Sequence, residues 1–280
     1  MTATVFAAVL LAALLHAGWN AVVKSGPDKL ASMAGMSVGH AVPGLACALV
    51  LPAPAPESWP WIAAGALLHC GYQWFLLNAY ALGDFTRVYP LARGSAPLLV
   101  ALVSTLALGV VLSGAEILAI GLIGAGLVSV ALARRGPADP KAVGAALATG
   151  LFIAGYTLVD GTGARLSGAP VAYFAWVSLL GAALFGGFTE WRRPGLVLRL
   201  PRAVPAAFFG GGLASFAAYA IVVWAFTQAP IALVAALRES SIVFALLIGA
   251  FVLRERVDGA RIASCFVTLC GVALLRLSKP

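Results

Sequence analysis

Charged residues are scarce in this chain. Only 10% of its 280 residues are Asp, Glu, Lys or Arg, whereas 62% are hydrophobic. A soluble domain carries about 25% charged residues, because it needs a polar surface around its core. The composition therefore excludes a soluble globular protein and predicts a chain that is solvated by lipid.

The sequence also lacks the common motifs of catalysis and of metal or nucleotide binding. It has no HExxH, no P-loop and no GxSxG serine with a suitably placed histidine. Its four cysteines form no CxxC pair and lie inside apolar runs, which predicts buried thiols and no metal site. We therefore expect a protein that is not an enzyme, holds no cofactor and is not an ATP-driven pump.

Basic residues outnumber acidic ones by 18 to 10, and the formal net charge is +8. In a soluble protein this excess would suggest nucleic acid as a partner. Here the charges lie in short gaps between apolar runs, so they predict topology signals and contacts with lipid headgroups.

Long apolar runs fill the rest of the chain. They are about twice the length of a β-barrel strand and match the roughly 20 residues of a spanning helix. We expect an all-α integral membrane protein of about ten transmembrane helices, at 4–23, 32–51, 60–82, 88–112, 116–134, 142–160, 170–190, 203–227, 230–253 and 259–276.

The two halves of the chain resemble each other. Leu14-Leu-His-Ala-Gly-Trp-Asn aligns with Leu151-Phe-Ile-Ala-Gly-Tyr-Thr, and Leu91-Ala-Arg-Gly-Ser aligns with Ala236-Leu-Arg-Glu-Ser. We therefore expect two repeats, 1–136 and 137–280. Each would hold five helices, an odd number, so the second repeat would be inverted in the membrane relative to the first.

Three stretches carry a resemblance to a known family: His16-Ala-Gly-Trp-Asn-Ala-Val-Val-Lys, Tyr89-Pro-Leu-Ala-Arg-Gly-Ser-Ala-Pro-Leu-Leu and Leu237-Arg-Glu-Ser-Ser-Ile-Val-Phe. They resemble the drug/metabolite transporter superfamily, in particular its ten-helix EamA-domain proteins. The resemblance spans essentially the whole chain. It implies secondary transport, often export, of a small metabolite, and we expect a multi-pass protein of the inner cell membrane.

Two signals in the sequence predict opposite orientations in the membrane. Most basic loop residues fall in the gaps on one side, and the positive-inside rule places that side in the cytoplasm and both termini outside. The family resemblance implies both termini inside. The loop charges favour the first orientation.

Arg93 and Arg238 are the first candidates for a substrate site. Each lies within an expected span, at equivalent repeat positions, and a charge at mid-membrane costs about 2.5–3.5 kcal/mol. Two alternatives stay open. The arginines bind an anionic or zwitterionic substrate through their planar forks, or Glu239 pairs with Arg93 and the cluster is structural.

Polar stripes on two helices supply further candidates. His16 and Asn20 are four residues apart and share one face of the first helix, where substrate contact, proton coupling or an interhelical hydrogen bond are the alternatives. The third helix carries a stripe that we expect to line a polar cavity: His69, Tyr72, Gln73 and Tyr80.

The remaining acids are expected outside the membrane core. Asp160 and Glu116 lie near expected helix ends, where a solvated loop or capping role is predicted. Small residues at 121, 125, 129 and 133 and at 259, 263 and 271 let helices approach closely, so the fifth and tenth helices are expected to have a packing role and no substrate role.

Three functions follow from these features. The first is a secondary transporter of a small anionic or zwitterionic metabolite, with alternating access at the repeat interface and a proton as the candidate coupling ion. The second is a proton-coupled exporter of lipophilic cations or drugs, which needs an unpaired buried carboxylate; Glu239 adjoins Arg238, which disfavours it. The third is a membrane scaffold that transports nothing.

Overall fold

The computed structural model describes residues 1–280 except 27, 83–84, 133–138, 253, 255–257 and 278–280, together with the side chains of residues 80 and 85–87. Within the described residues every regular element is helical, which confirms the all-α prediction. The helices are α1 (Ala3–Ser25), α2 (Lys29–Gly39), α3 (Ala41–Val50), α4 (Trp59–Leu82), α5 (Phe85–Leu106), α6 (Gly114–Leu132), α7 (Pro140–Ser167), α8 (Pro170–Arg192), α9 (Leu196–Ala203), α10 (Gly212–Gln228), α11 (Ile231–Arg238), α12 (Ser241–Leu247) and α13 (Gly259–Leu277).

Three short segments complete the chain. A single 3₁₀ turn, η1 (Pro56–Ser58), precedes α4, and two π-helical segments, η2 (Ala206–Gly211) and η3 (Ile248–Val252), precede α10 and follow α12. π-Helical turns within longer helices are rare and are frequent at functional sites.

Eight helical segments of the described chain are long and apolar enough to cross a membrane. Three of these are composite: α2 with α3, η2 with α10, and α11 with α12 and η3. Helices α4 and α5 are 24 and 22 residues long, which also matches the length of a span. The chain is a multi-pass membrane protein, and the number of ten spans stays a prediction.

Helix ends follow the local sequence. The Thr2 hydroxyl accepts a hydrogen bond from the backbone N–H of Val5 and caps α1, and the Asp28 carboxylate accepts one from Ala31 and caps α2. Gly168 takes a left-handed conformation, with φ of +66°, directly after α7, which glycine adopts without strain.

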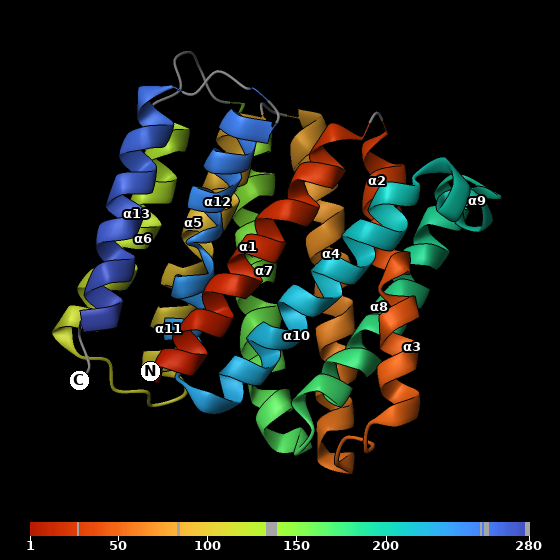
Figure 1. Ribbon diagram of the computed structural model, residues 1–280, viewed down its shortest axis with the longest axis horizontal. Coiled ribbons are helices and arrows are strands. Elements are labelled where there is room, and N and C mark those ends of the chain that lie inside the picture. The colour runs from red at the N-terminus through yellow and green to blue at the C-terminus, as the bar shows by residue number, and fades with distance from the viewer. Residues whose placement is uncertain (27, 83–84, 133–138, 253, 255–257, 278–280) are drawn as a thin grey trace.

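The helices run alternately up and down the bundle (Figure 1). α1 begins and α13 ends at the same, lower end of that view, whereas α1 ends and α13 begins at the upper end. Helices of the two halves are interleaved, because α1 packs on α10, α4 on α7, and α6 on α13. The core thus lies where the two halves meet.

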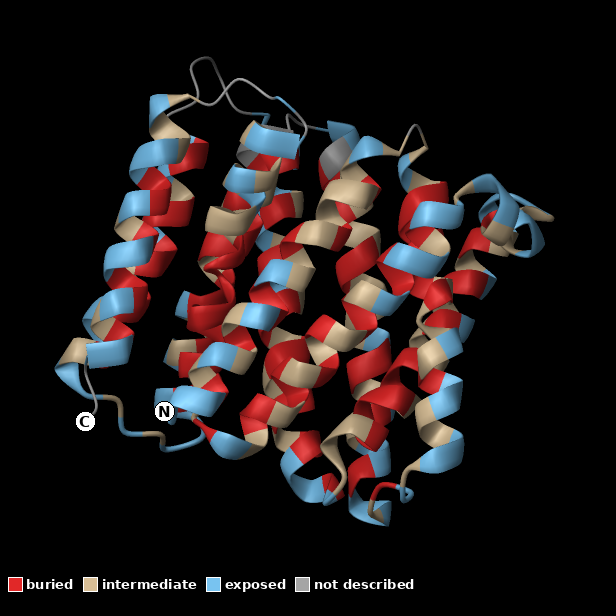
Figure 2. Cartoon of the chain, in the orientation of Figure 1, coloured by how far each residue is buried: buried red, intermediate tan, exposed pale blue. Residues whose placement is uncertain are grey.

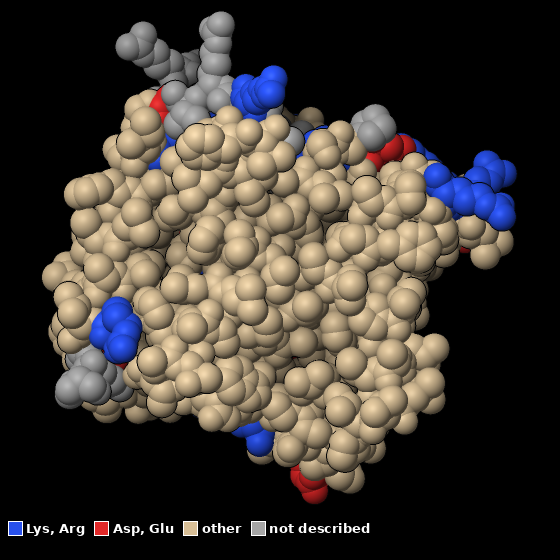
Figure 3. Space-filling model, in the orientation of Figure 1, with Lys and Arg blue, Asp and Glu red and all other residues tan. Residues whose placement is uncertain are grey.

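Burial divides each helix lengthwise (Figure 2). Buried residues face the middle of the bundle, and exposed residues face outward or lie at the two ends. Many outward side chains are large and apolar, such as Leu106, Leu132 and Phe251. The visible face carries charged side chains only towards its edges (Figure 3), which leaves an uncharged belt suited to lipid.

Helix α7 differs from its expected length. It continues to Ser167, seven residues past the end of the expected span at 142–160. Arg165, in its last turn, donates from Nε to the carbonyl of Phe226 at 2.8 Å and from NH2 to that of Ala229 at 2.9 Å. This side chain satisfies carbonyls at the end of α10, and it ties the last turn of α7, where a loop was expected, to α10.

Helices α6 and α13 pack closely, as expected, and they pack on each other. Of the expected stripes, Ala125, Ser129 and Ala263 are exposed, and residue 133 lies outside the described residues. The close contact is made at Gly271, which belongs to an expected stripe, and at Gly126, which does not. A Cβ atom on Gly126 would lie 2.9 Å from the Thr268 hydroxyl, and one on Gly271 would lie 2.7 Å from the Ile123 side chain.

Candidate substrate site

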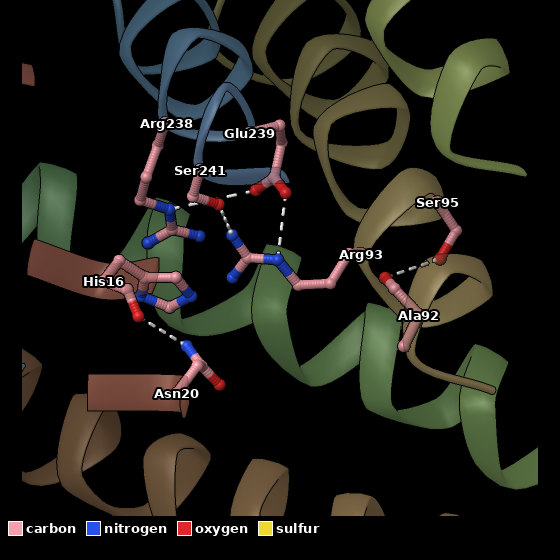
Figure 4. Close-up of polar contacts among 8 residues, drawn as sticks. All are labelled: His16, Asn20, Ala92, Arg93, Ser95, Arg238, Glu239 and Ser241. Atoms are coloured by element: carbon pink, nitrogen blue, oxygen red, sulfur yellow. Dashed lines mark hydrogen bonds and ion pairs between the residues drawn. The ribbon is translucent and has the colours of Figure 1, made fainter. Parts of the chain in front are cut away.

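Two basic residues and one acid meet in the middle of the bundle (Figure 4). Arg93 comes from α5, whereas Arg238 ends α11 and Glu239 follows it at the break before α12. Each of the three is at most 3% exposed. The Nε of Arg93 lies 2.9 Å from the Oε2 of Glu239, and its NH2 lies 3.4 Å from the Ser241 hydroxyl oxygen.

Arg238 is held less tightly than Arg93. Its Nε lies 3.9 Å from the Oε1 of Glu239 and has no hydrogen-bond partner within the described structure. Its guanidinium instead faces the rings of Tyr156 and Tyr219, at 6.0 and 5.7 Å from their centroids. A cation over an aromatic face is stabilised by the ring quadrupole, so Arg238 keeps hydrogen-bonding capacity that the chain does not use.

A cavity of about 130 Å³ adjoins this cluster; we call it the Arg93 cavity. It lies between α1, α5, α6, the α12–η3 segment and α13, and it extends from Arg93 and Glu239 towards Lys24 and Arg261. Most of its remaining wall is apolar: Ala17, Ala21, Leu127, Val130, Ile242, Ala245, Leu246, Ile248 and Ala250.

A second cavity of about 60 Å³ lies on the other side of His16; we call it the His69 cavity. Three members of the expected α4 stripe, His69, Tyr72 and Gln73, line it together with Arg238. The Ser37 hydroxyl lies 3.3 Å from the Gln73 Oε1 and donates to it. The fourth member, Tyr80, lies on α4, and its side chain is outside the described part of the structure.

His16 and Asn20 lie side by side on α1, as expected from their spacing. Both line the Arg93 cavity, and His16 also lines the His69 cavity. The Asn20 amide donates to the backbone carbonyl of His16 at 2.8 Å. The Nε2 of His16 is buried and has no hydrogen-bond partner in the described chain, so a polar group is left unsatisfied at the boundary between the cavities.

The expectation that Asp160 lies in a solvated loop is wrong. It is fully buried, because α7 continues past it, and its carboxylate accepts three hydrogen bonds. The donors are His69 Nε2 at 2.8 Å, the Tyr219 hydroxyl at 2.9 Å and the Tyr173 hydroxyl at 3.2 Å. The stripe on α4 had indicated His69, but nothing in the sequence indicated which helix supplies its partner.

Glu116 caps a helix, as expected. Its carboxylate accepts hydrogen bonds from the backbone N–H and the hydroxyl of Ser113, while its own N–H donates to that hydroxyl. Within the residues that the structure describes, no group of three His, Cys, Asp or Glu side chains is placed to hold a metal ion.

The comparisons with known proteins bear on both fold and family. One chain of known crystal structure is 21% identical to this chain and superposes with a TM-score of 0.73, over 99% of this chain and 98% of the other. That likeness is one of fold. None of the curated proteins compared with the chain matches it.

The family comparison concerns the second half of the chain. Residues 140–277, from the start of α7 to the end of α13, match the model of the EamA-like transporter family. This range contains Arg238, Glu239 and Asp160, and it confirms the resemblance that the sequence stretches had indicated. The chain belongs to the EamA-like transporter family, whose members are membrane transporters of small molecules.

Proposed function

We propose that the chain is a secondary transporter of a small anionic or zwitterionic metabolite across the inner membrane, and that export is its working direction. The substrate binds at Arg93 and Arg238 and reaches the two sides by alternating access between the halves. One observation carries the proposal: two buried arginines share a single buried glutamate where two cavities meet.

The charges of this cluster favour an anion. Arg93, Arg238 and Glu239 hold one net positive charge in a site that is almost closed to solvent, and the fourth buried charge, Asp160, balances it only from beyond the Tyr219 ring. A buried charge without a close partner is unfavourable, by several kcal/mol as an order of magnitude. A bound monoanion would neutralise this local excess and would use the Nε of Arg238, which has no hydrogen-bond partner in the described structure.

The walls of the Arg93 cavity narrow the substrate class. The end of this cavity at Arg93 suits a carboxylate or a phosphonate, since guanidinium binds both through paired hydrogen bonds, and Arg238 adjoins it from the His69 cavity. The apolar wall formed by α6, α12 and η3 suits an uncharged hydrocarbon portion. A zwitterion would also place its ammonium near Glu239, which would weaken the ion pair between Glu239 and Arg93.

Alternating access is supported by a difference between equivalent helices. α5 packs closely along α6, whereas α12 makes few contacts with α13, and the Arg93 cavity lies between these less tightly packed helices. In the expected repeat, α5 with α6 corresponds to α11–α12 with α13. Two halves in different conformations are what a carrier open to one side requires.

The exporter of lipophilic cations is a second candidate, because Asp160 is a buried carboxylate that the sequence did not reveal. Aromatic rings of Tyr156, Phe174 and Tyr219 surround its partner His69, as in a site for an organic cation. Asp160 itself lines neither cavity, and its carboxylate is engaged by three donors. The arginine site therefore has the stronger case.

A binding measurement on the purified protein in detergent tests the proposal. The melting temperature is recorded with benzoate, methylphosphonate, phenylalanine and tetraphenylphosphonium, since a ligand that binds only the folded state raises it by mass action. The same series is run on Arg238→Met, and on Arg199→Met as a matched control at an exposed position of α9.

We expect stabilisation by at least one anion or zwitterion, lost in Arg238→Met and kept in Arg199→Met. Stabilisation by tetraphenylphosphonium alone, lost in Asp160→Asn, would replace the anion carrier with the cation exporter. Uptake and release of the stabilising compound by reconstituted vesicles then measure the direction of transport.

A further inference from the structure

We propose that His69 and Asp160 form a proton-binding site that loads together with the anion at Arg238. The geometry of the pair stands independently of the substrate, whereas the identity of the co-bound anion rests on the proposed function. Nothing in the family comparison assigns a role to either residue.

The pair is built to hold one exchangeable proton. The Nε2 of His69 lies 2.8 Å from the Oδ2 of Asp160, and two tyrosine hydroxyls fix the carboxylate from other helices. Asp160 is closed to solvent, but the His69 side chain is 20% exposed and lines the His69 cavity. With Nε2 bound to the carboxylate, the second ring nitrogen can take a proton from water in that cavity, giving an imidazolium–carboxylate ion pair.

The titratable and charged groups near His69 come from six helices and from the α2–α3 junction. Asp160 and Tyr156 lie on α7, Tyr173 on α8 and Tyr219 on α10, whereas His16 from α1, His40 from the α2–α3 junction, Tyr72 from α4 and Arg238 from α11 line the same cavity. Among these groups Asp160 favours the imidazolium, and Arg238 opposes it.

Two aromatic side chains connect the proton site to the arginine site. The ring of Tyr156 stacks on His69, with centroids 4.1 Å apart, and its centroid lies 6.0 Å from the Arg238 guanidinium carbon. Tyr219 donates its hydroxyl to Asp160 while its ring faces the same guanidinium. The distance from the His69 ring centroid to the Arg238 guanidinium carbon therefore cannot exceed the sum of the two distances measured from the Tyr156 centroid, and no helix lies between the two side chains.

The charges explain why proton and anion load together. Arg93 and Arg238 balance Glu239 and Asp160 while His69 is neutral, so a proton on His69 leaves one uncompensated positive charge. An anion at Arg238 removes that excess, and linkage requires the effect to be mutual: each ligand raises the affinity for the other. Loaded together, they cross the membrane in the same direction, so export would then depend on the outward gradient of the substrate.

The coupling can be measured without knowing the substrate. The chain has three histidines, so selective ¹⁵N-histidine labelling gives three imidazoles to follow by NMR in detergent. His69→Gln assigns one of them by its loss. The proton-binding constant of His69 is then read by pH titration in the wild type, in Arg238→Met, in Glu239→Gln and in Arg199→Met as control.

We expect His69 to titrate and to respond to its charged neighbours. Removing the Arg238 charge has the same electrostatic effect on His69 as binding an anion beside Arg238. It should raise the proton-binding constant of His69 about tenfold or more. This estimate follows from Coulomb's law for two charges about 10 Å apart at an effective dielectric constant of about 20. Glu239→Gln should lower the constant, and Arg199→Met should leave it unchanged. If the Arg238 variant does not fold, addition of benzoate or methylphosphonate to the wild type makes the same test.

Two results would overturn the proposal. In the first, the His69 imidazole keeps one protonation state between about pH 5 and pH 9, the range in which histidine switches operate. In the second, His69 titrates, but neither the variants nor the anions change its proton-binding constant. These outcomes are separate from those of the binding experiment. A titrating His69 that responds to Arg238→Met in a protein that binds no anion would refute the anion carrier and leave the proton site standing.

Discussion

Arg93 and Glu239 form an ion pair that joins the two halves of the chain, with Nε 2.9 Å from Oε2. Arg238, at the equivalent position of the expected repeat, lies 3.9 Å from the same carboxylate. From the sequence alone, a structural role and a substrate-binding role are both open for the two arginines. The structure pairs the two arginines unequally: Arg93 lies close to Glu239, whereas the Nε of Arg238 has no hydrogen-bond partner in the described residues.

The two arginines should therefore respond differently to substitution. Arg93→Met leaves a buried carboxylate without its close partner, and breaking a buried pair in this way costs about 3–5 kcal/mol. Arg238→Met removes the less tightly paired cation, so we expect a smaller loss of stability together with loss of anion binding. Unfolding free energies in detergent, measured beside ligand-induced melting shifts, separate the two effects.

A double variant provides the control for this prediction. Arg93→Met combined with Glu239→Gln removes both charges of the pair, so much of the stability lost in Arg93→Met should return. Equal destabilisation by the single and the double variants would show that Glu239 does not depend on Arg93.

The contact of α6 with α13 predicts a contrast between two glycines of one helix. Gly126→Val should destabilise the fold by about 1–3 kcal/mol, because its side chain meets Thr268 and the Ser264 carbonyl, as in other overpacked sites. Gly121→Val, with nothing within 4 Å of its Cβ, is the matched control and should have little effect. Comparable losses in both variants would place the helix contact elsewhere.

A pH-dependent contribution to stability is predicted at the loop between α1 and α2. Burial opposes ionisation of Asp28, but the hydrogen bond from the Ala31 N–H and the ion pair with Arg193 outweigh it and lower the pKa of Asp28 below its ordinary value of 3.8. The stabilisation is thus present above that ordinary value and is lost as the pH falls through the lowered one.

Asp28→Asn isolates this charge, because asparagine keeps the side-chain oxygen that caps α2. We expect the melting temperature of the wild type to exceed that of the variant at neutral pH, and the difference to shrink on acidification below about pH 4. High salt should shrink it as well, since Arg193 is exposed. A difference that is constant from neutral to acid pH would mean that the pair does not contribute.

Membrane orientation can be tested at α9. Arg199 is exposed on this short helix, among basic residues at the upper end of Figure 1. In a variant whose four cysteines are replaced by alanine, Arg199→Cys should react with an impermeant maleimide in inside-out vesicles and not in intact cells, since the positive-inside rule places this end in the cytoplasm. Labelling in intact cells would instead support termini inside.

Arg93 and Arg238 could be singled out from sequence because the expected repeat marks them. A rare charge recurs at one offset within two apolar runs, and its cost in lipid makes it conspicuous. The alternation of the helices was predictable for a similar reason, since span length is fixed by the bilayer.

Asp160 could not be placed from sequence, for a reason that is local. Hydropathy falls after Val159 through Gly161, Thr162 and Gly163, and this composition is typical of a loop. The helix nevertheless continues, and Arg165 in its last turn binds carbonyls at the end of α10, a contact between distant parts of the chain that the local composition does not reveal.

The small-residue faces show another limit. Helix α6 carries glycines at 121, 124 and 126, so small residues lie on more than one of its sides. Spacing alone permits several contact faces. Which one meets α13 is decided by Thr268 and Gly271 on the partner helix.

Each half of the chain ends in the helix that meets the end of the other half, since α6 and α13 pack together at Gly126 and Gly271. Two separately synthesised pieces, cut between α6 and α7, would each carry the surface needed to find the other. The covalent link between the halves is then not needed for their assembly. A gene divided at that point should yield a heterodimer with the same arginines at its centre.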